Sequence, residues 1–462
     1  MARINRRRTH TFSRRRGMGK NAVTLLLLLL IAAGAAAGFI FFETEKPQLT
    51  LGKKISFLGG PVELPFKAVD KKSGIKQIVI TLEQGGGIYQ LFNKSFTRRA
   101  WLTQAGPEQV EESITLDLAR AGAKEGKAEL IITVRDFSFN GFLKGNATVT
   151  RLPVTIDTKP PKVTIKHAQK YIKPGSSGIV VYSISEPSKR HGVMIDSAFF
   201  QGYPLNQNKN TFIAYIALPW NAFKPESTQV IAQDQAGNTG KAIFSMHFKK
   251  AKEKKDRINV SDGFLNKKLP EFKEHYPEIK GTELEQYLYI NNTIRQLNAK
   301  QIAEICKNPV PEQLWYDRFI RMPGAGRAGY ADQRTYFYQG RAVDHQTHLG
   351  MDIASTARVG IKAANKGKVI YADYLGIYGN MVILDHGQGL TSLYSHLSSI
   401  DTEVGNIVEK DELIAHSGAT GLAGGDHLHF SILVHGIFVT PVEWWDQHWI
   451  NANINNVIKN AK

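Results

Sequence analysis

His427-Leu428-His429-Phe430-Ser431-Ile432-Leu433-Val434 is an apolar stretch that begins with two histidines, and its composition predicts a β-strand. Residues two apart on a strand lie on one face, so both histidines can address a single site. Two other histidine-bearing segments precede it, His348-Leu349-Gly350-Met351-Asp352 and Tyr394-Ser395-His396. Nine of the 14 histidines lie between residues 345 and 448. Because neutral imidazole is the commonest zinc ligand and aspartate supplies a compatible oxygen, these segments predict a metal site.

The residue types favour a catalytic metal site over a structural one. Catalytic zinc commonly has three protein ligands and an open fourth position, whereas a structural site is closed by four. One carboxylate and two imidazoles would leave a positive centre that acidifies bound water. Two more histidines nearby would accept the proton of that water and stabilise a developing oxyanion.

With the neighbouring segments, these motifs resemble the lysostaphin-type, or LytM-like, zinc metallopeptidases, which are peptidoglycan endopeptidases. The resemblance covers roughly residues 325–445 and does not extend to the preceding two-thirds of the chain. It rests on the order and spacing of five segments, which are His348–Ala354, Gly367–Val369, Tyr378–Gly387, Leu393–Leu397 and His427–Phe430. It implies a compact all-β catalytic domain, with its site in a groove, that cuts peptide bonds of peptidoglycan.

The resemblance assigns a role to five residues of this sequence. His348, Asp352 and His429 match the zinc ligands, and His396 and His427 match the catalytic histidines. All five positions are kept, although some relatives have lost their zinc ligands and activate other hydrolases instead. The resemblance therefore implies Zn²⁺ as cofactor and peptidoglycan peptides as substrate.

Two residues beside the site depart from the family pattern. Asp426 stands where many relatives carry proline, and Ser431 stands where many carry glutamate. Both departures put substrate preference in doubt more than activity. We interpret His386 as structural and Tyr394 as a residue that lines the groove, and His345 is either a substrate contact or without a role. The remaining histidines of this region match no metal position, and they are His416, His435 and His448.

Near the start of the chain, residues 22–42 are uncharged and almost wholly apolar. As a helix they would span roughly 31 Å, the thickness of a bilayer core. Eight basic residues and no acid lie in residues 1–20, which predicts a cytoplasmic N-terminus for the segment 1–21. A cleaved signal peptide is the alternative, but the apolar run continues past the small residues 33–37, which favours a retained anchor. The sequence thus predicts a single-pass protein of the cytoplasmic (inner) membrane, with its bulk in the periplasm or outside the cell.

The middle of the chain predicts two β-sandwich domains, over residues 45–157 and 158–249. Short alternating stretches are separated by turns that contain Gly, Pro and Asn. A repeated pattern supports two domains. One apolar strand ends in Asp136 and is followed four residues later by Asn140, and another ends in Asp234 and is followed four residues later by Asn238. This part loosely resembles tandem bacterial immunoglobulin-like domains. Their expected role is a spacer, and binding of a protein partner stays open.

Residues 250–322 are predicted to be a charged linker followed by a helical segment. The charged run itself covers residues 249–257. Thr282 and Glu285 form a capping box in the helical segment. An apolar stripe follows, made by Leu284, Tyr287, Leu288, Ile290, Asn291, Ile294 and Leu297. The segment is either a packing brace or a cover over the active site. Its end carries Cys306, the one cysteine of the chain, which we interpret as a packed core thiol.

Two other function classes are disfavoured. The formal charge of +18 suggests nucleic acid, but the basic N-terminal segment supplies eight of those charges and no nucleic-acid motif accompanies the rest. Gly324-Ala325-Gly326-Arg327-Ala328-Gly329 matches the dinucleotide-binding string, but the strand-like Gln333–Tyr338 follows it instead of a helix.

The sequence therefore predicts a mainly β protein with an N-terminal transmembrane helix, two immunoglobulin-like domains, a short helical segment and a zinc metallopeptidase domain at 323–448. Its predicted function is hydrolysis of peptide cross-links in peptidoglycan. The first alternative is a peptidoglycan-binding activator of another cell-wall hydrolase. A second alternative follows from turns such as Val408–Ile414, which are similar to those of β-rich carrier domains that phosphorylate histidine in the cytoplasm. The predicted anchor argues against that location.

Overall fold

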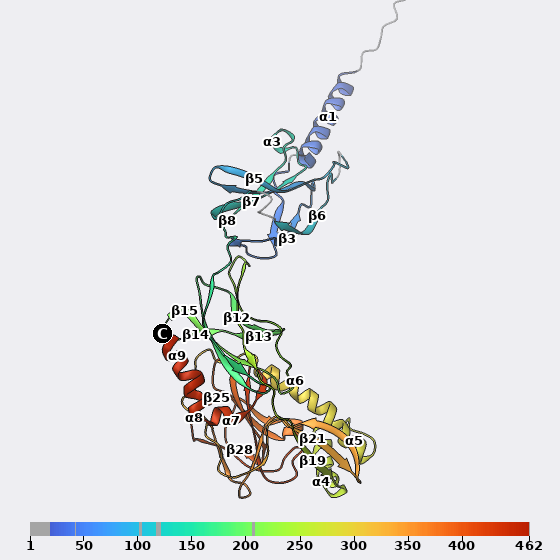
Figure 1. Cartoon of the computed structure of the whole chain (residues 1–462). Helices are drawn as coiled ribbons and strands as arrows, with labels where there is room; N and C mark the ends of the chain where they lie inside the picture. Colours follow the sequence, from blue (N-terminus) through green and yellow to red (C-terminus); the bar gives the residue numbers. More distant parts are fainter. Residues whose placement is uncertain (1–18, 42, 101–103, 117–121, 206–207, 462) are drawn as a thin grey trace, which may run out of the picture. The chain divides into compact units, whose positions relative to one another are not determined.

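A computed structural model describes residues 19–41, 43–100, 104–116, 122–205 and 208–461 (Figure 1). The chain is mainly β, as the sequence predicted, and helices are few. It divides into two compact units, one of residues 1–159 with 236–238 and one of residues 160–235 with 239–462. The basic segment predicted to lie in the cytoplasm falls almost wholly outside the described residues.

The first element is the apolar helix α1, Lys20–Phe41. Within residues 20–38, a window of 18 residues has a mean hydropathy of 2.1, and none of it is buried within the described chain. This length and composition suit either a membrane anchor or a signal sequence.

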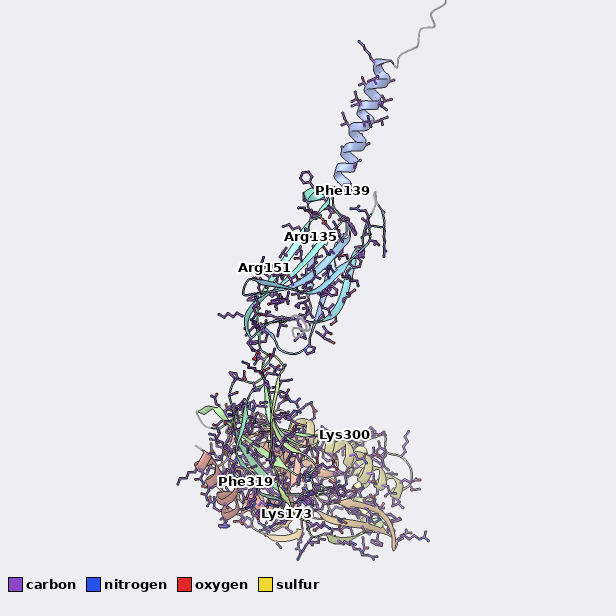
Figure 2. The ribbon with its side chains drawn as sticks, turned by 45° about the horizontal axis from the view of Figure 1, so that its top comes forward. Arg135, Phe139, Arg151, Lys173, Lys300 and Phe319 are labelled. Atoms are coloured by element: carbon purple, nitrogen blue, oxygen red, sulfur yellow. The ribbon has the colours of Figure 1, made fainter. Side chains whose placement is uncertain are left out.

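Two sheets enclose the core of the first unit. One has the strand order β1-β3-β6 and the other β2-β8-β7-β4-β5. In the β4–β7 pair, Ile78 faces Val134 and Leu82 faces Leu130, and all four are fully buried. Arg135 and Arg151, labelled in Figure 2, lie on the neighbouring strands β7 and β8. The elements of this unit are β1 Gln48–Leu51, β2 Phe57–Leu58, β3 Val62–Val69, β4 Ile75–Gln84, β5 Gly87–Ser95, β6 Gln109–Leu116, β7 Gly126–Asp136, α3 Asn140–Leu143 and β8 Ala147–Ile156.

Two four-stranded sheets open the second unit, with the orders β14-β15-β11-β9 and β13-β12-β16-β17. Strand β11 is buried along almost its whole length, because it is central in its sheet and is covered on both faces. These two sheets and the two of the first unit are layered pairs of the kind that the sequence predicted, while their kinship with immunoglobulin domains stays a prediction. The strands are β9 Val163–Ala168, β10 Tyr171–Ile172, β11 Ser177–Ile184, β12 Arg190–Ile195, β13 Ala198–Gln201, β14 Tyr203–Leu205, β15 Asn208–Ala217, β16 Thr228–Gln233, β17 Thr239–Ile243 and β18 His247–Phe248.

The predicted charged linker is in part a strand, so that prediction is wrong from Lys254 onward. Strand β19, Lys254–Val260, pairs in parallel with β21, Asp332–Tyr338. Val260 is buried, and Lys254 forms an ion pair with the buried Asp332. The charges of this segment therefore lie on an edge strand, with Ile258 and Val260 packed beneath.

Helices follow β19, as predicted, and the capping box of Thr282 and Glu285 is present. The helices are α4 Asp262–His275, α5 Glu283–Tyr289, the π-turn η1 Ile290–Ile294 and α6 Arg295–Ile305. The predicted apolar stripe holds as far as Ile294 and then fails, because Leu297 is 50% exposed. Asn298 and Ile302, four and eight residues after the buried Ile294, take the buried face of α6 instead. Cys306 is buried, as expected of a core thiol, and burial raises its pKa to about 11.

The last part of the chain is built on a long sheet with the order β20-β23-β31-β27-β26-β25-β29. A three-stranded sheet, β24-β30-β28, and the β19-β21-β22 sheet complete it. Its elements are β20 Ala325–Ala328, β22 Arg341–Thr347, β23 Met351–Ala354, β24 Gly360–Lys362, β25 Gly367–Tyr374, η2 Gly376–Tyr378, β26 Asn380–Asp385, β27 Leu390–Leu397, β28 Ser399–Ile400, β29 Ile407–Val408, β30 Leu413–His416, β31 Leu428–Val434 and β32 Ile437–Val439. Helices that the sequence did not predict end the chain, and they are α7 Pro441–Trp445, α8 Gln447–Ile450, the π-turn η3 Asn451–Asn455 and α9 Asn456–Ala461.

One hydrophobic core crosses the predicted boundary between residues 158–249 and 323–448. Tyr215 of β15 packs against Trp444 of α7, and Tyr203 of β14 stacks on His435. The amide of Thr440 donates to the carbonyl of Gly175. The second pair of sheets is therefore packed directly against the C-terminal sheet within one unit.

Candidate metal centre

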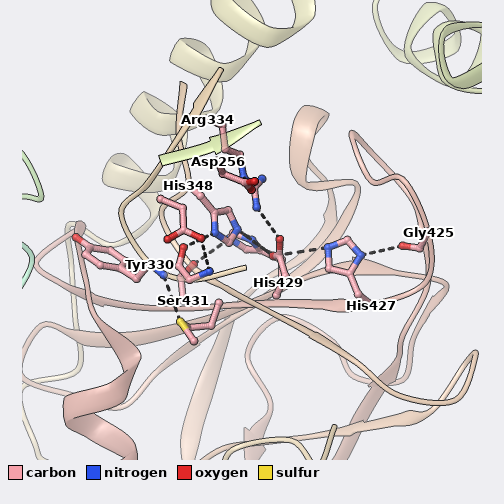
Figure 3. Close-up of polar contacts among 12 residues, drawn as sticks. Asp256, Tyr330, Arg334, His348, Gly425, His427, His429 and Ser431 are labelled. Atoms are coloured by element: carbon pink, nitrogen blue, oxygen red, sulfur yellow. Dashed lines mark hydrogen bonds and ion pairs between the residues drawn. The ribbon is translucent and has the colours of Figure 1, made fainter. Parts of the chain in front are cut away.

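Adjacent strands at the centre of the C-terminal sheet bring the predicted metal residues together. Strands β23 and β31 are antiparallel, with Asp352 directly opposite His429. His348 lies in the turn before β23, where its amide donates to Asp332 O and its carbonyl accepts from Ala331 N. Figure 3 shows His348 and His429 side by side at this point of the sheet.

The three side chains form a tight triangle of potential metal ligands. His348 Nε2 lies 2.9 Å from Asp352 Oδ1, and His429 Nδ1 lies 2.9 Å from the same oxygen. The two ring nitrogens are 2.9 Å apart. All three residues are buried, with exposures of 5–7%. This group is one of those able to hold a metal ion in the described chain.

Hydrogen bonds outside the triangle fix the tautomer of both imidazoles. The carbonyl of Gly329 can only accept, so His348 carries its proton on Nδ1 and donates to it at 2.8 Å. Ser431 Oγ donates to Leu349 O, so the hydroxyl accepts from His429 Nε2. The nitrogens that face each other are therefore both lone pairs, and Asp352 adds a carboxylate oxygen. Such a set is suited to a cation and not to internal hydrogen bonds, so the residues fit the metal that the sequence predicted.

Close packing keeps these rings in place. A Cβ atom at Gly350 would lie 2.5 Å from the ring of His429 and 2.6 Å from Ser431 Oγ. Only glycine therefore fits between the first two predicted ligands. The requirement explains the glycine in His348-Leu349-Gly350-Met351-Asp352.

The two predicted catalytic histidines lie on the open side of the triangle. The rings of His396 and His427 are 4.9 Å apart, and the ring of His396 is 5.8 Å from that of His429. His396 donates from Nδ1 to Thr420 O, and His427 donates from Nδ1 to Gly425 O, each at 2.8 Å. Each neutral imidazole therefore keeps the lone pair of Nε2 for proton exchange.

His396 reaches this position through an irregular backbone. Its φ is +62°, and the register of β26 with β27 shifts between the residues opposite Tyr394 and Leu397. The irregularity turns the His396 side chain away from the face that the strand alternation assigns to it. Tyr394 consequently lies in the core against Phe430, where its hydroxyl accepts from Ala364 N. Its predicted place in the groove is wrong.

Asp352 is the electrostatic centre of the group. Burial works in the opposite direction, but the facing His348, His427 and His429 hold the pKa of Asp352 well below its usual range. Burial lowers the pKa of His429 to about 4 and lowers that of His396 strongly. Burial also acts to lower the pKa of His427, but the Asp352 carboxylate, 3.6 Å from Nε2, raises it.

Arg334 is a site residue that the sequence reasoning missed. Its Nη2 donates to Asp352 Oδ2 at 3.0 Å, and its Nε lies 3.9 Å from Asp256 on β19 (Figure 3). The arginine therefore secures the carboxylate oxygen that does not face the imidazoles. It sits on a strand without a motif, so no local signal in the sequence marks it.

A cavity of about 980 Å³ opens over these side chains. The five predicted site residues line it together with β21, β22 and the helical segment, which contributes Phe264, Tyr287 and Arg295. Helix α4 is also hydrogen-bonded to residues 419–421 at the rim of the cavity, because Lys268 donates to Ala419 O and Gly421 N donates to Glu271. Asn298 Oδ1 accepts from Ile377 N, beside Tyr378. The helices thus brace the rim and form one wall of the cavity.

The other histidines of this region lie outside the triangle. His386 is fully buried, with its ring nitrogens bonded to Lys366 O and Ser392 Oγ, in agreement with a structural role. His416 pairs with Asp401, and His435 packs against Phe200. His448 is exposed on α8, and His345 lies on the cavity wall, where Thr335 contacts it.

Comparison with known proteins finds matches to the C-terminal part of the chain. Residues 346–441 match the profile of peptidase family M23. The DD-carboxypeptidase/endopeptidase Mpg of Neisseria meningitidis is 36% identical over 95 residues, which are 21% of this chain and 22% of that protein. The murein hydrolase activator EnvC of Escherichia coli is 38% identical over 95 residues, 21% of this chain and 23% of EnvC. The catalytic domain of lysostaphin from Staphylococcus simulans is 26% identical, with a TM-score of 0.23, over 26% of this chain and 92% of that domain.

The C-terminal part of the chain therefore carries a peptidase family M23 domain, of the LytM-like kind that the sequence predicted. The chain matches less than a quarter of the length of the curated relatives. Those relatives include both a peptidase and an activator of other hydrolases.

Proposed function

We propose that this protein is a membrane-anchored zinc endopeptidase that hydrolyses peptide cross-links of peptidoglycan. One observation carries the proposal: two imidazole lone pairs and one carboxylate oxygen converge in a cavity that also holds two further histidines. The match of residues 346–441 to peptidase family M23 supports the same reaction.

In the proposed mechanism, His348, Asp352 and His429 would hold Zn²⁺, which would supply Lewis-acid chemistry at the site. Arg334 holds Asp352 in place, and Gly329 O and Ser431 Oγ orient the two ligand imidazoles. His396 and His427 present Nε2 toward the cavity, where one accepts the proton of the attacking water through its Nε2 lone pair and the other, in its protonated form, donates from Nε2 to the oxyanion. The helical wall excludes solvent from one side of the substrate.

The membrane location is part of the proposal. Helix α1 is long and apolar enough to cross a bilayer, and the basic residues before it favour a cytoplasmic N-terminus. The site would then work in the periplasm or outside the cell, where peptidoglycan lies. The pair of sheets in the first unit would serve as a spacer, with room for a protein partner, whereas the second pair packs against the C-terminal sheet.

The test is digestion of purified peptidoglycan by the zinc-loaded full chain, with and without a chelator. We expect released cross-linked peptides that disappear with the chelator and fall at least 100-fold in His427→Ala. His416→Ala is the matched control, because His416 is a partly exposed histidine outside the site. Absence of released peptides from the zinc-loaded protein would refute the peptidase.

Similarity to EnvC favours a second candidate, a module that binds peptidoglycan and activates a partner hydrolase. Retention of all five site residues favours the enzyme. Growth of a deletion strain complemented with His427→Ala distinguishes the two functions. Full complementation by that variant would support the activator, and failure at equal protein level would support the peptidase.

A further inference from the structure

The first unit holds a group of acidic side chains that the peptidase function does not use. Glu43, Asp70 and Asp136 come from distant parts of the sequence, yet one carboxylate oxygen of each lies within 4.8 Å of the others. Their exposures are 4%, 5% and 0%. Carboxylates are rarely buried together unless a cation compensates them.

The fold delivers these three groups from three chain segments. Glu43 follows helix α1 closely, Asp70 comes directly after β3 and Asp136 ends β7. Asn146 ties two of the segments together, because its Nδ2 donates to Glu43 O and Asp136 Oδ2. The loop after β7 includes Phe139, which Figure 2 labels.

Backbone amides satisfy the two aspartates only in part. Asp136 Oδ1 accepts from the amides of Ser138 and Asn146, and Asp70 Oδ1 accepts from the amide of Gly74. These bonds restrain one oxygen of each aspartate. They supply no positive charge.

Glu43 is the unsatisfied member of the group. Neither of its carboxylate oxygens has a hydrogen-bond partner among the residues that the structure describes, and both are buried. Burial, Asp70 and Asp136 raise its pKa to about 7, outweighing the opposing effects of Lys72 and of the nearby Ser73 amide, which does not reach hydrogen-bond geometry. Lys72 is half exposed and pairs with Glu45. The group therefore lacks a buried counter-charge from the described chain.

We propose that Glu43, Asp70 and Asp136 form a binding site for a hard divalent cation, and specifically for Ca²⁺. The donors are all oxygens, which suits Ca²⁺ and disfavours the softer metals that imidazole selects. One carboxylate at the end of a strand and two outside regular structure suit the flexible coordination of Ca²⁺ better than the strict octahedron of Mg²⁺. This site is separate in sequence and in chemistry from the histidine triangle.

Binding would fasten the chain just after the apolar helix to the loops that follow β3 and β7. Without the cation, repulsion among the carboxylates loosens that junction. Extracellular calcium modules bind with dissociation constants of roughly 10⁻⁴–10⁻³ M, which is the range expected here if the unit lies outside the membrane.

The experiment uses the full chain in detergent, loaded with zinc and depleted of calcium, with CaCl₂ as the probe. Equilibrium dialysis with radioactive calcium is expected to show one Ca²⁺ bound per chain. Thermal unfolding is expected to shift upward by several degrees at saturating calcium, because the ion binds the folded state alone. Glu43→Gln is expected to lose both effects. Glu45→Gln, an exposed neighbour two residues away, is expected to keep them.

The sign of the stability change adds a second readout. In calcium-free buffer Glu43→Gln is expected to be at least as stable as the wild type, because it removes an unpaired buried charge, whereas in calcium it is less stable. Asp70→Asn provides a second variant if Glu43→Gln does not fold. The proposal would be overturned if folded Glu43→Gln or Asp70→Asn still bound calcium. It would also be overturned if the wild type bound no calcium at a concentration 10-fold above the expected dissociation constants. An equal affinity for Mg²⁺ would overturn the assignment to calcium. None of these readouts depends on peptidase activity.

Discussion

At the scale of single residues, the metal site depends on which group donates each hydrogen bond. Gly329 O and Ser431 Oγ take the outer N–H groups of His348 and His429, which leaves both inner nitrogens as lone pairs. Ser431 was a departure from the family pattern in the sequence. In the structure it is the residue that orients His429, so the departure preserves the ligand.

Removing that hydroxyl tests its role. In Ser431→Ala the outer N–H of His429 loses its acceptor, and we expect the affinity for zinc to fall roughly 10–100-fold. The measurement is competition with a chromophoric zinc chelator. Ser398→Ala, which removes an exposed serine hydroxyl from the same domain, is the control and should bind zinc like the wild type. An unchanged affinity in Ser431→Ala would show that the hydrogen bond does not position the ligand.

Sequence reasoning at this scale works where residues share a motif. The spacing of His348 and Asp352, and of His427 and His429, predicted side chains that the structure brings together. Arg334 could not be predicted, because a strand without a motif carries it to Asp352. Tyr394 was misplaced, because the alternation of a regular strand does not anticipate the positive φ of His396.

At the scale of elements, local irregularities decide which face of a helix or strand is buried. The capping box of Thr282 and Glu285 depends on two residues only three positions apart, so it was predictable from the sequence. The burial of Asn298 in place of Leu297 was not, because an apolar stripe does not anticipate the tertiary hydrogen bond that Ile377 N donates to Asn298. Likewise, the charges of Lys254–Arg257 indicate solvent exposure, but they do not exclude an edge strand paired to β21.

Helix α7 docks onto β11 through a buried carboxylate, which makes that contact sensitive to pH. Glu443 Oε2 accepts from the amide of Ser177 at 3.1 Å, and burial raises the pKa of Glu443 to about 7. Because this pKa is higher in the folded than in the unfolded chain, the stabilising contribution is complete below about pH 4.5 and is lost as pH rises through about 7.

Glu443→Gln keeps an acceptor for Ser177 and removes the ionisation. We expect the variant and the wild type to unfold alike at pH 4.5, and the variant to be more stable at pH 8 by roughly 2–3 kcal/mol. Denaturant unfolding across this pH range measures the difference in unfolding free energy between the variant and the wild type. Other titrating groups contribute equally to both proteins and cancel in this difference. Glu409→Gln, at an exposed carboxylate paired with Lys366, should show no such trend. A difference that does not grow with pH would contradict the buried ionisation.

At the scale of the whole molecule, the largest difference from the sequence prediction is that two regions predicted as separate domains, 158–249 and 323–448, pack together. Periodicity and turn residues indicate where sheets begin and end, but they do not show which sheets share a core. Trp444 illustrates this, since its burial depends on Tyr215, more than 200 positions earlier. The sheets of residues 160–248 are thus part of the fold that holds the metal site.

This shared core predicts that the M23 match alone is an incomplete folding unit in this protein. A chain of residues 323–462 would expose Trp444 and His435 and would lose the parallel pairing of β21 with β19. We expect it to bind a hydrophobic dye and to unfold at a lower temperature and with less cooperativity than residues 160–462. Calorimetry and dye fluorescence of the two chains measure this, and zinc saturation of both excludes a metal effect. Equal unfolding midpoints would mean that the contacts of Tyr203 and Tyr215 are dispensable, and that residues 160–248 act only as a spacer.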